Sequence, residues 1–163
     1  MSKQISTNFT DTAIAGVTAP VITLPVLNYD NDFRLKSSSA DEVSMVNTTT
    51  SLDVDETIRL SVAEIADIYK NTGVTADLIS NTKLGYSLLV QVIRTVKVTD
   101  SANPAYCSYL PLAAHMVLKI PKAEGVTSDT IKELIARVVS TLYDGSTFKA
   151  LGMLKGAISP KGL

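Results

Sequence analysis

The sequence predicts an α+β fold, in which an antiparallel β-sheet meander with an N-terminal hairpin precedes two C-terminal α-helices. Three observations support this class. Apolar and polar residues alternate with a period of two over 57–62 and 86–98, which indicates strands with one polar side. An apolar stripe at helical spacing follows after residue 127. Strands come first and helices last, without repeated strand–helix–strand units, which favours an antiparallel sheet.

The first 50 residues are expected to form short strands separated by turns. The strand candidates are Val21–Leu27, Phe33–Lys36 and Val43–Thr49, and Tyr29–Asp32 has the composition of a turn. Prolines at positions 20 and 25 cannot donate a ladder hydrogen bond. The first candidate is therefore expected at an edge of the sheet or in an arm.

The central part supplies the main strands of the sheet. The expected elements are a strand at Thr57–Val62, a helical segment at Ala63–Lys70, a long strand at Tyr86–Val98, a loop at Thr99–Tyr109 and a strand at His115–Ile120. A polar connection runs from the helical segment to Gly85. On the long strand Arg94 is the exception on an otherwise apolar side.

The C-terminal part changes to helical spacing. Thr127 and Ser128 offer side chains that can cap a helix start. The apolar stripe of this helix consists of Ile131, Leu134, Ile135, Val138 and Leu142. Asp144-Gly145 is expected to end it, and Ser146 to cap a second helix carrying Phe148, Leu151 and Leu154.

Length and composition indicate one domain over 1–163, with N-terminal strands at 1–50, central strands at 56–120 and helices at 127–159. The formal net charge of −1 excludes a strongly basic free nucleic-acid binder. A mean hydropathy of +0.21 without a membrane-length apolar run favours a protein that buries surface against its own copies. No signal peptide is indicated, and a single cysteine, Cys107, allows no intramolecular disulfide.

Catalytic motifs are not found in the sequence. It has no GxGxxG, GxxxxGK[ST], HExxH or GxSxG pattern, and His115 and Cys107 have no motif partner. Asp53, Asp55 and Glu56 are interpreted as a solvated turn. We therefore expect no enzyme, no cofactor and no metal.

Several blocks of the sequence resemble one family. Residues 113–121 (AAHMVLKIP), a polar loop, and residues 130–137 (TIKELIAR) are similar to the last strand and first helix of the coat proteins of small single-stranded RNA bacteriophages. Residues 58–62 (IRLSV) and 90–92 (VQV) are similar to the two strands before them. The chain departs from the family in its longer N-terminal 50 residues and in an insert at 63–84.

The resemblance implies a fold whose helices reach across a dimer partner and cover its sheet. It also implies a homodimer that builds an icosahedral T=3 shell around the RNA genome in the bacterial cytoplasm. The partners would be other copies of the chain and single-stranded RNA, with no membrane; recognition of a specific stem-loop stays open. The residues expected at the dimer interface are Ile131, Leu134, Ile135, Val138, Leu142, Phe148, Leu151 and Leu154.

One side of the predicted sheet carries most of its polar residues. From the residues alone this is the solvated side of an antiparallel sheet, whereas the resemblance implies that it lines the shell and binds RNA. Its members are Arg59, Ser61, Ser87, Gln91, Thr95, Lys97, His115 and Lys119. The resemblance also places Cys107 near the symmetry axes, as a candidate contact between subunits.

Three functions remain open on the sequence. The first is the capsid protein, and the second is a dimeric RNA-binding translational regulator that does not assemble. The third is a small α+β enzyme or ligand-binding domain with a self-contained core.

Overall fold

The computed structural model describes residues 11–148, apart from 14, 17, 18, 20, 81 and 104. The chain divides into two compact units, Val26–Ala123 and the combination of Met1–Pro25 with Glu124–Leu163. The larger unit contains α1 (Tyr29–Asp32), β1 (Phe33–Ser38), β2 (Glu42–Asn47), β3 (Glu56–Ile65), the 3-10 helix η1 (Ala76–Leu78), β4 (Gly85–Thr99) and β5 (Cys107–Pro121). The other unit contains α2 (Ser128–Leu142), β6 (Tyr143–Asp144) and β7 (Thr147–Phe148). The single domain expected over 1–163 stays a prediction.

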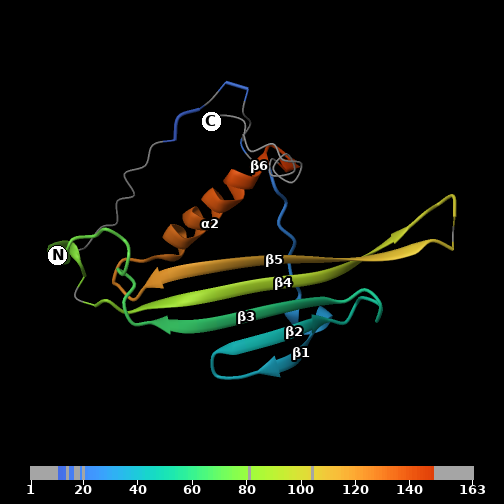
Figure 1. The fold of residues 1–163 in the computed structure, drawn as a ribbon, viewed down its shortest axis with the longest axis horizontal. Helices are drawn as coiled ribbons and strands as arrows, with labels where there is room; N and C mark the ends of the chain where they lie inside the picture. The colour runs from blue at the N-terminus through green and yellow to red at the C-terminus, as the bar shows by residue number, and fades with distance from the viewer. Residues whose placement is uncertain are drawn as a thin grey trace. The chain divides into compact units, whose positions relative to one another are not determined.

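The larger unit is built on one five-stranded sheet (Figure 1). Its strand order is β1-β2-β3-β4-β5, and every neighbouring pair is antiparallel. Spatial order equals chain order, so each connection joins adjacent strands without a crossover. This confirms the predicted antiparallel meander and the α+β class.

The sheet has a small apolar core within the described residues. Phe33, Ile58 and Leu118 are its buried apolar side chains. They come from β1, β3 and β5 respectively. Many other large apolar side chains of the described residues are exposed, among them Leu35, Leu112 and Val117.

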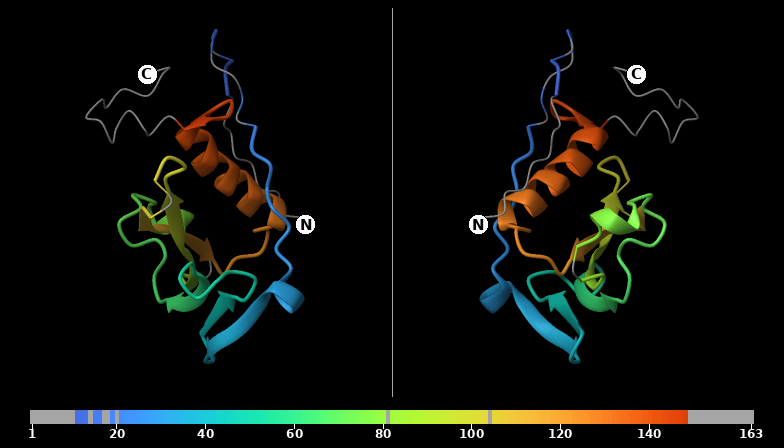
Figure 2. Two further views of the ribbon diagram at one scale, coloured as in Figure 1. Left: turned by 90° about the vertical axis from the view of Figure 1, so that its right-hand side faces the viewer. Right: turned by 90° about the vertical axis from the view of Figure 1, so that its left-hand side faces the viewer.

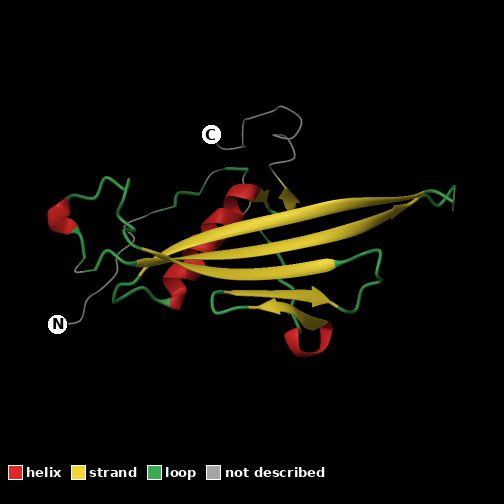
Figure 3. Cartoon of the chain, turned by 60° about the horizontal axis from the view of Figure 1, so that its bottom comes forward, coloured by secondary structure: helices red, strands yellow, loops and turns green. Residues whose placement is uncertain are grey.

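Strands β4 and β5 are the longest strands and run on together past the other strands (Figure 3). They pair continuously from Gly85 opposite Pro121 to Thr99 opposite Cys107. Strand β3 accompanies β4 only as far as Arg94. Beyond that point β4 and β5 form a two-stranded ribbon, which the loop of residues 100–106 closes.

The helix expected at Ala63–Lys70 is wrong, because β3 continues to Ile65. Ala63 pairs with Ser87 and Ile65 with Gly85, so strand pairing overrides the local helical spacing. Gly85 then matters for packing. A Cβ at this position would lie 2.6 Å from Ile68 Cδ1 and 2.9 Å from a backbone oxygen, so the start of β4 leaves no room for a side chain.

Strand β5 begins at Cys107, well before the expected start at His115. The loop expected at Thr99–Tyr109 overlaps its first three residues, and the strand also contains Pro111. Proline is compatible with a strand at the edge of a sheet, and β5 is an edge strand.

The N-terminal segment Val21–Leu27, expected as a strand, is extended but belongs to no sheet. Its first residue donates a backbone hydrogen bond of 3.0 Å from Val21 N to Gly145 O. The expected turn at Tyr29–Asp32 is the one-turn helix α1, capped by Asn28.

Helix α2 begins after Thr127, whose side chain accepts a hydrogen bond from Thr130 N, and runs unbroken in orange in Figure 2. The predicted start of the second helix is wrong, because Ser146 lies in the turn between β6 and β7 and Phe148 lies in β7. Leu151 and Leu154 lie outside the described residues. None of the helices within the described range is long and apolar enough to cross a membrane.

Candidate assembly and nucleic-acid surfaces

Strand register decides which side chains share a face, because residues directly opposite each other in an antiparallel pair point to the same side. Arg59 lies opposite Gln91, and Gln91 lies opposite His115. Residues two positions away along each strand point the same way. The residues on this side, called the polar face below, include the whole predicted RNA-binding set: Arg59, Ser61, Ser87, Gln91, Thr95, Lys97, His115 and Lys119.

The polar face also carries apolar side chains. Leu89 lies opposite Val117, and Ile93 lies opposite Ala113, all at the same alternate positions. Val117 and Ile93 are exposed. The face is thus a mixed surface, in which polar groups surround exposed aliphatic ones.

Two polar contacts tie the middle of this face together. Arg59 Nη2 donates to Glu42 Oε2 at 2.6 Å. This hydrogen bond lowers the pKa of Glu42 and raises that of Arg59. Across β4 and β5, the Gln91 amide nitrogen lies 3.0 Å from His115 Nε2. The Arg59 charge is therefore already balanced within the sheet.

A second polar cluster joins the β2–β3 loop to the ribbon. Asp53 accepts hydrogen bonds from the Ser51 hydroxyl at 2.5 Å and from Tyr109 Oη at 2.6 Å. Its Oδ2 lies 3.4 Å from Lys97 Nζ, which sits 5.7 Å from the centre of the Tyr109 ring. The Ser51 and Tyr109 hydroxyls lower the pKa of Asp53, whereas Asp53 and then Cys107 raise the pKa of Tyr109.

Next to this cluster a backbone and a side-chain bond fix the same loop. Thr95 N donates to Asp55 O at 2.9 Å, and the Thr95 hydroxyl donates to Asp55 Oδ1 at 2.9 Å. The polar groups of Thr95 and Lys97 are thus engaged by the loop. Of the four basic side chains in the predicted RNA-binding set, Arg59 and Lys97 are ion-paired.

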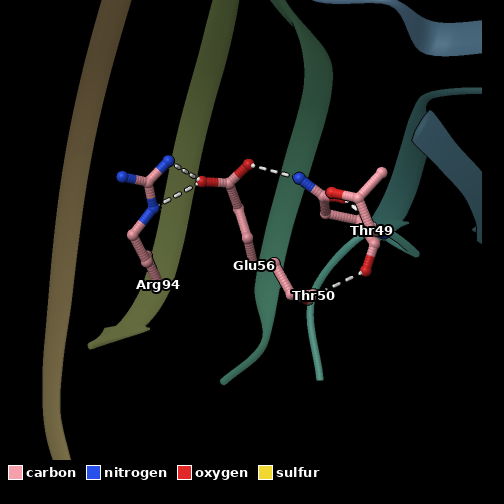
Figure 4. Close-up of polar contacts among 5 residues, drawn as sticks. Thr49, Thr50, Glu56 and Arg94 are labelled. Carbon is pink, nitrogen blue, oxygen red and sulfur yellow. Dashed lines mark hydrogen bonds and ion pairs between the residues drawn. The ribbon is translucent and has the colours of Figure 1, made fainter. Parts of the chain in front are cut away.

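The opposite side of the sheet is mostly apolar, but it carries a buried polar network around Glu56, shown in Figure 4. Glu56 is 5% exposed. Its Oε2 accepts a hydrogen bond of 2.6 Å from Arg94 Nε, and Arg94 Nη2 also pairs with it. Glu56 Oε1 accepts from Asn47 Nδ2 at 3.2 Å, and Asn47 Oδ1 in turn accepts from Thr49.

This network corrects the solvated turn expected for Glu56. Glu56 is the first residue of β3 and lies directly opposite Arg94 on β4. The network also explains why Arg94, a charged residue, lies on the otherwise apolar side of β4. Arg94 balances a buried carboxylate that ties β2, β3 and β4 together.

Within the described residues, the apolar stripe of α2 is largely exposed. Helix α2 has no buried residue. Leu134, Val138 and Leu142 are 49%, 47% and 40% exposed. Ile131 and Ile135 are half-buried. Phe148, expected in the same interface, is also exposed and its ring lies 5.5 Å from that of Tyr143.

Strand β5 lies at one end of the sheet and, among the described residues, pairs only with β4, so its other edge is called the free edge below. It is 15 residues long and pairs with β4 without a register shift. Cys107 at its start is exposed. In the part of the chain that the structure describes, no group of three or more His, Cys, Asp or Glu residues could hold a metal.

Sequence reasoning missed the contribution of Asp53 and Tyr109. Asp53 was assigned to a solvated turn and Tyr109 to a loop, and their contact spans 56 positions in the chain. The β5 alternation offered one signal. Tyr109 stands at an even separation from His115 and Lys119, which is the spacing of one strand face.

Comparisons with known proteins point to one kind of assembly. No protein-family model and no curated protein sequence matches the chain. Among solved structures, the virus-like particle of bacteriophage AVE015 matches 99% of this chain and 100% of that chain, with a TM-score of 0.85 and 30% identity. The virus-like particle of bacteriophage GQ-112 also matches 99% of this chain and 100% of that chain, with a TM-score of 0.72. At 16% identity, this match shows a similar fold.

The first match spans the whole chain at 30% identity, and the sheet order agrees with the resemblance of the strands and the first helix. These observations agree on a structural role in a capsid. The chain belongs to the coat-protein family of small single-stranded RNA bacteriophages.

Proposed function

We propose that this capsid protein forms a homodimer, that dimers build an icosahedral T=3 shell, and that the polar face binds the enclosed single-stranded RNA. The shell would be the virion, assembled in the cytoplasm of the bacterial host. The observation that carries self-assembly is the apolar and hydrogen-bonding surface that one chain leaves uncovered. Its two parts are the α2 stripe and the β5 edge.

The two edges of the sheet differ in a way that selects β5 for pairing with another copy. Strand β1 has six residues and an irregularity between Leu35 and Ser37, and Lys36 lies at that point. Shortness, a bulge and a lysine are common protections of an edge against pairing. Strand β5 has 15 residues in regular pairing. A long regular edge is suited to continue the sheet into a second subunit.

The prolines of β5 indicate which of its backbone N–H groups point away from β4. Pro111 and Pro121 occupy the same alternate positions, and proline has no N–H to donate to β4. Lys122 N, one position on, donates to Leu84 O on the β4 side. The backbone N–H groups at the same alternate positions as Pro111 and Pro121, which include those of His115 and Lys119, therefore point to the free edge. They are the donors that a neighbouring strand would use.

The α2 stripe supports a partner that covers it. Three of its five side chains remain about half exposed. Soluble monomers rarely expose such continuous apolar rows. We infer that Ile131, Leu134, Ile135, Val138 and Leu142 pack on the sheet of the partner subunit. Phe148, Leu151 and Leu154 are proposed for the same interface.

The polar face is the proposed RNA surface. Hydroxyl, amide, imidazole and ammonium groups can contact phosphates, sugars and unpaired bases, and exposed aliphatic groups can pack on base faces. His115 and Lys119 are exposed, whereas Arg59 and Lys97 are engaged by carboxylates. We therefore place the strongest phosphate attraction around Lys119, beside its cross-strand neighbour Ser87.

Cys107 is proposed as a contact between subunits near the symmetry axes. It is exposed at the base of the ribbon loop, so a second copy could reach its thiol. One cysteine per chain permits only a pairwise disulfide. Reducing and non-reducing gels of purified particles test this, and a monomer band in both gels would contradict it.

The proposed function is tested by expressing the full chain alone. Size-exclusion chromatography and negative-stain electron microscopy should show uniform shells with nuclease-protected RNA. A dimer that binds RNA without forming shells would favour the translational regulator instead. A monomer with neither property would contradict both.

The RNA surface has its own test. Lys119→Gln should lower the amount of packaged RNA and the salt sensitivity of RNA binding, because one phosphate contact is lost. Lys70→Gln, an exposed lysine in the β3–β4 connection, is the matched control. Equal RNA content in both variants and the parent would contradict this location.

A further inference from the structure

The ribbon formed by the ends of β4 and β5 lacks the support that the rest of the sheet has. Beyond Arg94, β4 has β5 on one side and no pairing with β3 on the other. An isolated two-stranded hairpin is only marginally stable in water. Val98 and Leu110 are exposed on it, so the ribbon also lacks a covered apolar side.

The β2–β3 loop supplies contacts at the root of this ribbon. Asp53 accepts from Tyr109 Oη at 2.6 Å and lies 3.4 Å from Lys97 Nζ, so one carboxylate contacts both strands. Lys97 and Tyr109 are directly opposite each other. Ser51 Oγ donates to the other Asp53 oxygen at 2.5 Å and orients the carboxylate.

We propose that Asp53, Lys97 and Tyr109, called the hairpin clamp below, fix the direction in which the ribbon leaves the sheet. The clamp acts by tying both strands of the ribbon to a loop that is itself held at Asp55 by Thr95. The effect of the clamp on assembly rests on the proposed function, in which copies of the chain form a shell. The direction of the ribbon sets where its tip meets other copies.

In the clamp, Lys97 positions the ribbon instead of contacting RNA. The ammonium group lies between a carboxylate and an aromatic ring, and both stabilise a cation. The Tyr109 hydroxyl donates to the same carboxylate, so the three groups form one connected unit. A phosphate at Lys97 would have to compete with Asp53 for the ammonium group.

The ionisation states of Asp53 and Tyr109 in the clamp do not change over the neutral pH range. The pKa of Asp53 is lowered by its hydrogen bonds, so the carboxylate stays charged at any pH above the ordinary aspartate value of about 4. The pKa of Tyr109 is raised, so its hydroxyl stays a donor up to and beyond the ordinary tyrosine value of about 10. The clamp is thus a fixed support and not a switch at physiological pH.

Two minimal variants test the clamp in the full-length protein. Tyr109→Phe removes one hydroxyl, and Asp53→Asn removes the charge while keeping the shape. Hydrogen exchange of the ribbon amides should become roughly threefold to tenfold faster in each, as expected for losing one solvent-exposed hydrogen bond. The double variant should exchange little faster than either single variant, because both break the same unit. The control is Asp77→Asn, at an aspartate of η1 whose pKa is lowered mainly by a hydrogen bond with Thr75.

Electron microscopy of the same preparations tests the consequence for the shell. We expect clamp variants to give particles of mixed size or incomplete shells, and the control to give uniform ones. Unchanged ribbon exchange in both single variants would overturn the clamp. Faster exchange with uniform particles would overturn the link between ribbon direction and shell geometry. If the parent protein forms no particles, the proposed function fails, while the exchange measurement still decides the clamp.

Lys97→Met separates the two roles of this lysine. The clamp predicts faster ribbon exchange with unchanged RNA content per assembled subunit. A loss of packaged RNA with unchanged exchange would overturn the assignment of Lys97 to positioning.

Discussion

Leu134→Asp places a carboxylate in the middle of the apolar stripe of α2. Leu134 is 49% exposed in the single chain, so about half of its side chain is available to a partner. Burying that half contributes about 1 kcal/mol per subunit, since a fully buried leucine contributes roughly 1.5–3 kcal/mol. In a symmetric dimer the loss occurs twice.

The introduced charge adds a second cost. A carboxylate taken out of water without a partner costs at least about 1–3 kcal/mol per subunit. The dimer should therefore lose about 4 kcal/mol or more, which weakens association roughly a thousandfold. Because we expect folding to depend on the partner, the variant should also lose its cooperative unfolding transition.

The assay compares particle yield, chromatographic size and thermal unfolding with those of Ala136→Asp. Ala136 is exposed on the same helix but outside the stripe, so its variant carries the same new charge. Leu134→Asp should give no particles, and Ala136→Asp should assemble. Normal particles from Leu134→Asp, or a soluble Leu134→Asp monomer that unfolds cooperatively, would refute the partner-covered stripe.

Three further outcomes are expected. Gly85→Ala should cost about 1–3 kcal/mol and lower the melting temperature by about 2–10 °C, because its Cβ would lie 2.9 Å from Ile120 O; an unchanged melting temperature in calorimetry would contradict this packing. Arg94→Met should cost about 2–3 kcal/mol by leaving the buried Glu56 carboxylate unpaired, and adding Glu56→Gln should restore part of the loss in thermal unfolding. The stability difference between the parent and Asp53→Asn should be constant from about pH 5 to 8 and shrink below about pH 4 in urea unfolding. The sign follows from the lowered pKa of Asp53, because the unfolded chain takes up the proton first as the pH falls.

Local patterns were sufficient for the parts of the fold in which neighbours in sequence decide the structure. The alternation over 57–62 and 86–98 lies within β3 and β4, and the cap at Thr127 begins α2. Even the shared polar face followed from a period of two, since the register places the whole predicted set on one side. These features depend on side-chain periodicity and capping, which are local properties.

The errors fall where pairing with a distant strand overrides local preference. Ala63–Lys70 has helical spacing, but its first three residues pair with Gly85–Ser87 of β4 and extend β3. The composition of Thr99–Tyr109 predicted a loop, but Cys107–Tyr109 pair with Lys97–Thr99 of β4 and belong to β5. The error at 143–148 is local instead, because a short hairpin that pairs Tyr143 with Phe148 takes the place of the expected helix start.

By itself, the sequence determined the α+β class, the polar side of the sheet and the apolar stripe that calls for a partner, because all three are periodic in the chain. Only the tertiary structure decided which charges on that polar side are already balanced. Arg59 meets Glu42 and Lys97 meets Asp53 across separations of 17 and 44 residues. No local pattern encodes such contacts, because they exist only once the strands are in register.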